Sequence, residues 1–354
     1  MDPATLSTET KKDLIRKNWL RQEVDEVPFL IEIGPFHGAT TRYFSDDAAE
    51  LAWNVDYHRQ REGLYDYGMP NIKPNQGIGI VASAFGCPYT VNDDADPWVK
   101  HLISEENRTD VKALEMPDTV NNPVFKRAFE RVAYFESRSQ LPLRLLNVPS
   151  PLVTASLIWD YTSFMEATIL YPQEVHLLLE KVTAATIDYV KHQLALIHNL
   201  HTMGHEMWYL PRNLGVRLSD DTAALMSPTL YREFGVRYNN MISRAFGGIV
   251  VHSCGDVQNV VDVMTETEAL VGLDLTIPQN PNWEKIRDAV SGKTAVNLRH
   301  YYWDHPGDSS IDLVEYSKQL MNFFGRKGVF IQTSARNAVE AHELGKRLHG
   351  ALSR

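Results

Sequence analysis

The chain has 354 residues, 44% hydrophobic and 23% charged, which is typical of a globular protein with ample core. A formal net charge of −10 without a Lys/Arg run excludes general nucleic-acid binding, because phosphate contacts need a basic face. No apolar stretch has the length of a membrane span, and residues 1–19 lack the apolar core of a signal peptide. With only Cys87 and Cys254, a disulfide scaffold is excluded and a reducing, cytoplasmic location is expected.

The first half of the chain predicts regular elements separated by irregular segments. Residues 1–26 are polar and predict a helix and a loop that form an extension outside the main body. Pro123 near the start of an apolar pattern with helical spacing predicts a helix over residues 121–140. The other elements expected here are a helix near residues 46–64, an apolar helix within residues 149–170, and strands at residues 27–33, 77–83 and 141–148.

From Pro172 the pattern becomes regular. A helix opens at Pro172, and a second helix has Ser227 as its N-cap and ends at the glycines 247 and 248. The strands expected in this half are residues 201–208, 249–253, 269–276, 294–302 and 328–334, nearly all followed by a helix. The count reaches eight strands, which is the repeat of a (β/α)8 TIM barrel. We therefore expect one α/β barrel domain over residues 27–354, preceded by the extension.

Barrels of this type carry their chemistry at the C-terminal ends of the strands. Polar and aromatic residues gather at the predicted ends, which are His37, residues 85–87, residues 147–151, residues 206–209, His252 with Cys254, Asp274, residues 299–302 and residues 333–336. The functional residues are expected among them.

The segment GGIVVHSCGD, residues 247–256, carries the strongest of these signals. Strand alternation places His252 and Cys254 on one side of the chain, so that an imidazole nitrogen and a thiolate can converge on one point. Both are good zinc ligands, but a zinc site needs at least three ligands from the protein. The alternative is a hydrogen-bonded histidine beside an inert cysteine.

Four segments of the chain resemble the uroporphyrinogen decarboxylase superfamily. They are LSDD..ALMSPTLYREF....N at residues 218–239, VVHSCGDV after the next helix, SAFGC at residues 83–87, and PL.TA after the third predicted strand. The resemblance covers most of the chain from residue 27. It implies a barrel that carries one of two chemistries, the cofactor-free decarboxylation of a porphyrinogen or a methyl transfer that involves a corrinoid and zinc.

The sequence departs from the decarboxylase branch where a porphyrinogen would bind. That branch has an arginine-rich segment after the first strand, whereas this chain has IGPFHGATTRYF with Arg42 alone. The tyrosine of the branch after the third strand is replaced by Leu157, and its late histidine segment by QTSARN. A substrate with many carboxylates needs several cations, so decarboxylation of uroporphyrinogen is not expected.

The methyltransferase branch fits better. Its zinc members resemble this chain at His252 and Cys254, but their third ligand, a late cysteine, is replaced by Thr333 and Ser334. The resemblance to relatives with carboxylate ligands implies that Glu206 or Asp221 completes the site, as a ligand or proton donor. The alternatives are capping and surface solvation for Asp221 with its neighbour Asp220, and a buried ion pair, for example with Arg212, for Glu206.

Other residues are weaker candidates. His37 could act in catalysis, and Arg299, His300 and Tyr301 could line a pocket. Trp208 and Tyr209, with Tyr302 and Trp303, would make an aromatic wall for a methoxylated ring or a corrinoid. The alternatives are a hydrogen-bonded structural histidine and ordinary aromatic packing. Neither a dinucleotide-binding glycine pattern nor a nucleophile elbow is present.

These signals predict an enzyme that transfers a methyl group between a small methylated, for example methoxylated, substrate and a separate corrinoid protein. Zinc at His252 and Cys254 would act as a Lewis acid. Since the chain has no room for a corrinoid domain, the corrinoid would arrive on a partner, and the resemblance implies a homodimer. The alternatives are a decarboxylase or other lyase that uses carboxylates and histidine, and a non-catalytic barrel that binds a small ligand.

Overall fold

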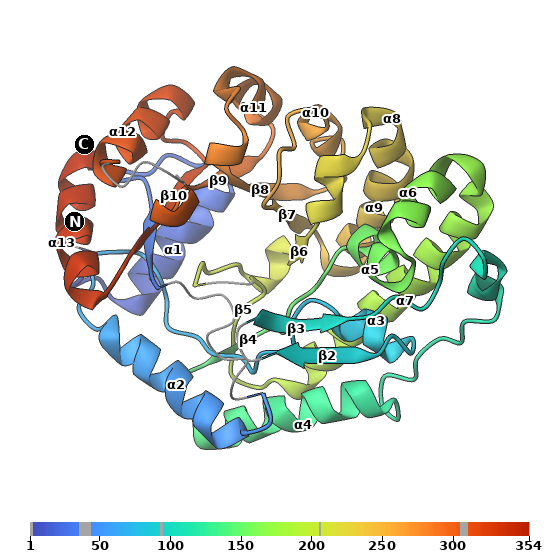
Figure 1. Ribbon diagram of the computed structural model, residues 1–354. Coiled ribbons are helices and arrows are strands. Elements are labelled where there is room, and N and C mark those ends of the chain that lie inside the picture. Colours follow the sequence, from blue (N-terminus) through green and yellow to red (C-terminus); the bar gives the residue numbers. More distant parts are fainter. Residues whose placement is uncertain (1–2, 35–43, 93–94, 205–206, 305–310, 354) are drawn as a thin grey trace.

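The computed structural model describes residues 3–34, 44–92, 95–204, 207–304 and 311–353, and its centre is a curled parallel sheet (Figure 1). The six strands of this sheet follow the order β1-β10-β9-β8-β7-β6, and every neighbouring pair is parallel. They are β1 (Phe29–Ile33), β6 (Val216–Ser219), β7 (Ile249–Ser253), β8 (Leu270–Thr276), β9 (Ala295–Arg299) and β10 (Val329–Ala335). Parallel strands with helical connections make an α/β fold that resembles a TIM barrel.

Helices surround the sheet, and both chain ends lie on the same side of the molecule, near α13 (Figure 1). The helices are α1 (Thr8–Trp19), α2 (Asp47–Gln60), α3 (Ile80–Ala84), α4 (Pro123–Arg138), α5 (Pro151–Ile158), α6 (Tyr161–Leu170), α7 (Pro172–Leu196), α8 (Pro228–Leu230), α9 (Arg237–Phe246), α10 (Val261–Met264), α11 (Trp283–Val290), α12 (Leu313–Phe324) and α13 (Ala338–Leu352). Within the described residues, no helix combines the length and apolar character that crossing a membrane requires.

The side of the fold between β1 and β6 is irregular. It holds the short parallel pair β4 (Leu143–Arg144) and β5 (Leu200–Thr202), whose register shifts between its two residue pairs. Isolated bridges extend the pairing, from Ile72 to Leu143 and from Pro149 to Ser219. The eight regular strands of a closed barrel are therefore not confirmed, because only six strands form the continuous sheet in the described part of the chain.

The second predicted strand is wrong. Residues 77–83 were expected to be extended, but Gly77 has a φ of 59° and residues 80–84 form the short helix α3, which is buried throughout. A short apolar run fits a buried helix as well as a buried strand, so periodicity alone does not separate the two. The predicted strand at residues 141–148 shortens to β4, and the one at residues 201–208 overlaps β5 only at residues 201 and 202. The sequence did not predict β6, nor the hairpin of β2 (Tyr89–Asn92) and β3 (Ala95–Val99).

The N-terminal helix packs against the sheet. Asn18 of α1 donates to the carbonyl of Val329 over 2.7 Å, and its side-chain oxygen accepts from the amide of Gly328 over 3.0 Å. The Trp19 ring lies 4.2 Å from the ring of Phe330, centroid to centroid. The expected helix at residues 1–26 is thus observed as α1, while the division of the chain at residue 26 stays a prediction.

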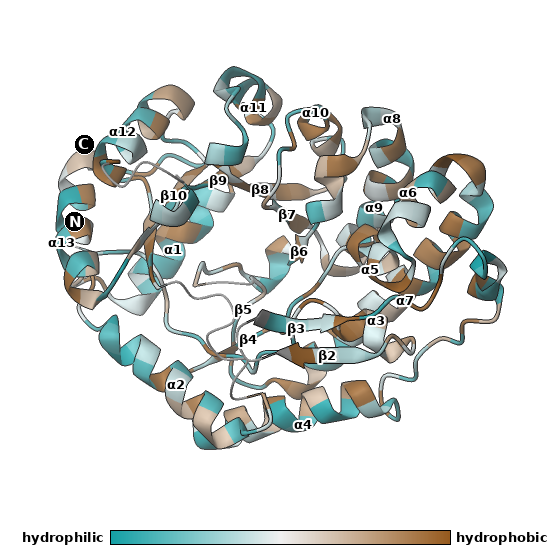
Figure 2. Ribbon diagram, viewed as in Figure 1, coloured by the Kyte–Doolittle hydropathy of each residue, from teal (hydrophilic) through white to brown (hydrophobic). Residues whose placement is uncertain are grey.

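A row of buried polar side chains crosses the largely apolar sheet. β1, β6, β7, β9 and β10 are buried along their whole length. Figure 2 shows β7 and β8 in hydrophobic colours inside the ring of helices, whereas α2 and α11 carry many hydrophilic residues, drawn in teal. Yet His252, Asp274 and Asn297 stand side by side on three adjacent strands, each buried. A row of buried polar groups needs hydrogen-bond partners, and it marks the place where the fold holds its site.

Candidate active site

His252 and Cys254 meet at the C-terminal end of β7. The preceding helix α9 ends at Gly247, whose φ of 81° forms the left-handed cap that returns the chain to the sheet. His252 is buried, and its Nε2 lies 3.0 Å from the Sγ of Cys254, which is exposed. The two side chains thus converge as the strand spacing predicts.

Asp221 joins them from the loop after β6. Its Oδ1 accepts a hydrogen bond from the amide of Cys254 over 2.7 Å and lies 4.0 Å from the Nε2 of His252. One ligand atom from each of the three residues falls within 4.8 Å of the others. With metal bonds of about 2.0–2.3 Å, the ligand atoms of a tetrahedral zinc lie about 3.5 Å apart. The nitrogen, sulfur and oxygen donors therefore fit a zinc ion with small adjustments.

Asp220 fixes the loop that carries Asp221. Its amide donates to the carbonyl of His252 over 2.7 Å, which ties this loop to β7. Its carboxylate accepts from Ser150 over 2.7 Å, Tyr231 over 2.8 Å and Asn239 over 3.0 Å. Burial raises the pKa of Asp220, although these three hydrogen bonds act against the rise. Because Asp220 is fully buried, surface solvation does not explain it.

A buried charge network supports His252 from below. The Nδ1 of His252 hydrogen-bonds the backbone carbonyl of Asp274 over 3.0 Å and lies 3.2 Å from the Oδ2 of the same residue. Arg217 donates to this Oδ2 through Nε over 2.9 Å and Nη2 over 2.5 Å, and Asn297 donates to the other oxygen over 2.9 Å. A histidine whose Nδ1–H is held by a backbone carbonyl or a carboxylate turns its Nε2 toward a ligand, as in many metal sites.

The network favours a positive charge at His252. Burial by itself lowers the pKa of His252, and Arg217 and Arg299 act in the same direction. The negative charges of Cys254 and Asp274 outweigh them and raise the pKa to about 10. The pKa of Asp274 is held low in spite of burial, because of Arg217 and then His252 and Arg299. Either a proton on His252 or a metal cation beside it would supply the positive charge that the network favours.

The residues predicted at the end of β9 separate into two groups. Arg299 lines the cavity, and its Nη1 lies 3.1 Å from the Nδ1 of His252. Tyr301 is buried behind it, where its hydroxyl accepts from the Nε of Arg299 and donates to Glu32, each over 3.1 Å. The side chain of His300 instead hydrogen-bonds the Ser317 hydroxyl of α12 over 2.9 Å and is not among the residues that line the cavity.

The remaining candidates lie away from the cluster or outside the described residues. Trp208 is buried and donates to Gln332 over 2.9 Å, while the carbonyl of Tyr209 accepts from the last residue of α1. Neither lines the cavity described next. His37 and Glu206, both proposed for catalysis, fall outside the described residues.

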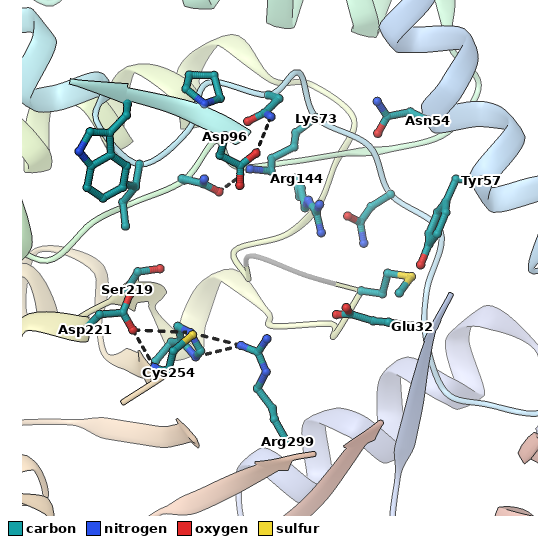
Figure 3. A pocket seen from close by; sticks show the side chains of 18 of the residues that line it. Glu32, Asn54, Tyr57, Lys73, Asp96, Arg144, Ser219, Asp221, Cys254 and Arg299 are labelled. Carbon is teal, nitrogen blue, oxygen red and sulfur yellow. Dashed lines mark hydrogen bonds and ion pairs between the residues drawn. The ribbon is translucent and has the colours of Figure 1, made fainter. Parts of the chain in front are cut away.

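The cluster opens into a cavity of about 280 Å³ at the C-terminal end of the sheet (Figure 3). Among its lining residues are Asp221, Cys254, Arg299, Glu32, Lys73 and Arg144. Sequence reasoning missed the last three. Arg144 carried a signal, since it interrupts the apolar run LPLRLLNV. Lys73 lies in a segment without periodicity, and nothing in its surroundings singled it out.

Comparison with protein families confirms the predicted resemblance to the uroporphyrinogen decarboxylase superfamily. The family model described as uroporphyrinogen decarboxylase (URO-D) matches residues 57–197. This region contains Lys73 and Arg144 and ends before the segments that carry Asp221, His252 and Cys254. No curated protein sequence matches the chain.

Comparison with solved structures supports the fold. A methyltransferase from Methanosarcina mazei shares 15% sequence identity and a TM-score of 0.68, over 96% of this chain and 97% of that one. At this identity the likeness shows the fold alone, since one fold serves many functions.

Two further structures are more distant. A B12-independent methionine synthase from Shewanella sp. W3-18-1 gives 10% identity and a TM-score of 0.41, over 63% of this chain and 65% of that one. A putative vitamin-B12 independent methionine synthase from Listeria monocytogenes gives 12% identity and a TM-score of 0.40, over 63% and 68%. With so low a structural similarity, neither bears on the function of this chain.

Proposed function

We propose that the protein is a zinc-assisted methyltransferase, which moves a methyl group between a small methylated substrate and a corrinoid carried by a separate protein. The observation that carries this proposal is the convergence of Asp221, His252 and Cys254 on one point of the cavity wall. The methyltransferase from Methanosarcina mazei, whose fold extends over nearly the whole chain, adds support.

The residues of the chain have distinct parts in this proposal. Asp221, His252 and Cys254 would hold the zinc ion, and Asp274 would keep the Nε2 of His252 turned toward it. When bound, zinc supplies a Lewis acid that stabilises negative charge on the oxygen or sulfur of the substrate. Arg299, at 4% exposure, lies beside the ring of His252 and adds a fixed positive charge to the same wall.

In the direction of demethylation, the bond between the methyl carbon and the substrate heteroatom breaks, and the heteroatom keeps the electron pair. A reduced corrinoid on the partner protein would accept the methyl group and would supply the electron pair for the new bond. The heteroatom leaves as an anion, which is the charge that the cationic wall would favour.

Metal content and methyl transfer together test the proposal. We expect about one zinc per chain by elemental analysis of the purified protein, lost in His252→Ala. Methyl transfer from a panel of methoxylated compounds to reduced cobalamin should collapse in Cys254→Ser. Cys87→Ser is the matched control, because Cys87 is buried beside Leu157 with its pKa raised by burial to about 12. Full activity of Cys254→Ser, or zinc retained in His252→Ala, would reject the proposal.

A second candidate function is a decarboxylase or lyase that needs no metal. The observation in its favour is the presence of Lys73, Arg144 and the carboxylate of Glu32 in one cavity, since such groups could hold a substrate carboxylate and move a proton. Substrate turnover that survives removal of all zinc would favour this candidate.

A further inference from the structure

Two cations from neighbouring segments lie on the wall of the cavity across from the metal-ligand candidates. Arg144 belongs to β4, and its amide donates to the carbonyl of Ile72 over 3.0 Å, which places Lys73 beside it. In Figure 3, Lys73 and Arg144 lie on the opposite side of the cavity from Asp221 and Cys254.

The surroundings of the two cations are polar. Asn71, Asn75 and Asn147 line the same part of the cavity, and Lys73 donates to the side-chain oxygen of Asn147. The amide nitrogens of the three asparagines donate to the carbonyls of Met69 and Gly77 and to the carboxylate of Asp96. Among the described residues of this wall, the acid is Asp96, which is exposed. Ammonium and guanidinium groups on one concave surface are the groups that bind an oxyanion.

The two positive charges on this wall repel each other. Arg144 is buried with 8% of its surface exposed, and Lys73 is half-buried. Burial and then the positive charge of Arg144 lower the pKa of Lys73 to about 7, although Asp96 and Glu50 act in the opposite direction. A carboxylate between the two cations would reduce this repulsion, because opposite charges within a few ångströms stabilise each other most where water is scarce.

We propose that Lys73 and Arg144 form a carboxylate-binding subsite, and that the substrate is a small methylated carboxylic acid. Its carboxylate would lie against this wall, and its methylated end would face Asp221, His252 and Cys254. The cavity of about 280 Å³ admits a single ring or a short chain with both groups. The reaction at the methylated end rests on the proposed function above, while the binding of the acid does not depend on it.

Binding of a matched pair of ligands to the full chain tests the subsite. 4-Methoxybenzoate and 4-methoxybenzamide have nearly the same shape and differ in charge, and methoxyacetate with methoxyacetamide repeats the comparison without a ring. We expect each acid to bind at least tenfold more tightly than its amide, measured by calorimetry or ligand-detected NMR. Equal binding of acid and amide, or binding of none of the acids, would overturn the inference.

Variants assign the effect to the two cations. Arg144→Gln and Lys73→Gln should each weaken binding of the acid about tenfold and leave the amide unchanged. Arg232→Gln, an exposed arginine paired with Glu266, is the matched control. If Arg144→Gln does not fold by circular dichroism, Lys73→Gln carries the test, since its side chain is half-buried. Acid binding unchanged in the folded variants would refute the subsite.

The Cys254→Ser variant separates this inference from the proposed function. It should lose methyl transfer and keep the tenfold preference for 4-methoxybenzoate over 4-methoxybenzamide, because Cys254 lies across the cavity from the subsite. Retained methyl transfer in Cys254→Ser together with weakened acid binding in Lys73→Gln would reject the zinc mechanism and keep the subsite. The opposite pair of results would keep the mechanism and reject the subsite.

Discussion

Replacing Asp274 by Asn should damage both the stability of the protein and its affinity for zinc. Asp274 is 3% exposed and takes two hydrogen bonds from Arg217, one from Asn297 and a close contact from the Nδ1 of His252. An asparagine keeps the shape but removes the charge that two buried arginines face. Breaking a buried ion pair on one side costs about 3–5 kcal/mol of unfolding free energy.

The effect of Asp274→Asn on zinc has a separate cause. Loss of a carboxylate behind a ligating histidine typically weakens metal binding about 10–100-fold. At about 1.4 kcal/mol for each tenfold change in affinity, the loss of zinc-binding free energy is roughly 1.4–2.8 kcal/mol. Urea denaturation monitored by circular dichroism measures the free energy of unfolding, and competition with a zinc chelator measures the zinc affinity.

A surface variant controls the Asp274 experiment. Asp288→Asn removes a carboxylate that is exposed and pairs only with its neighbour Arg287 among the ion pairs of the described chain, so it should change stability by less than about 0.5 kcal/mol. If Asp274→Asn binds zinc as tightly as the wild type, the orienting role of Asp274 is refuted. If the free energy of unfolding of Asp274→Asn is unchanged as well, the buried charge network around Asp274 does not stabilise the fold.

Three other perturbations follow from the site and the fold. Asp220→Asn turns one of the two acceptor oxygens into a donor, so that the hydroxyl of Ser150 or of Tyr231 loses its acceptor, and it should cost about 1–3 kcal/mol of unfolding free energy. Zinc affinity should fall because the loop of Asp221 loosens; an unchanged denaturation midpoint would contradict this. The affinity for 4-methoxybenzoate should be highest below about pH 7 and fall about tenfold by pH 9, because Lys73, with its pKa lowered to about 7, loses its charge as the pH rises. An affinity that does not change with pH in calorimetry would argue against a carboxylate bound at Lys73. Gly215→Ala should cost at least about 3 kcal/mol, since Gly215 has a φ of 96° and an added Cβ would overlap the Gly248 carbonyl, whereas a stable variant by thermal melting would refute the close approach.

The part of the fold that sequence predicted best is the half after residue 249. There each strand is a compact apolar run and a helix follows it, so hydrophobic pattern and chain length agree on the element type. Strands β7, β8 and β9 fall within the predicted ranges, and β10 ends one residue beyond its range. Where the barrel pattern breaks, as at residues 77–83, the apolar run is too short for periodicity to separate a strand from a helix, and packing decides.

The candidate site was predictable where it depends on strand ends. His252 and Cys254 converge because alternate residues of a strand share one side, and Asp221 follows the neighbouring strand β6. The meeting of the two cations was not predictable, although Arg144 interrupts an apolar run, because the isolated bridge from Ile72 to Leu143 that brings Lys73 beside Arg144 has no local sequence pattern. The aromatic wall expected from Trp208 lies elsewhere, since its indole is buried against Phe330 at a ring distance of 5.0 Å.

The six-stranded sheet and the irregular side of the fold differ in how many backbone hydrogen bonds hold their residues, which bears on how each can change in evolution. The continuous ladder of six strands carries the residues proposed for the reaction, and a substitution there disturbs many backbone hydrogen bonds at once. The side built from β4, β5 and single bridges has few such bonds to lose, yet it supplies the two cations that face the cavity. Under the proposals above, exchange of Lys73 or Arg144 would change the acid that the cavity selects and leave the residues on the opposite wall in place.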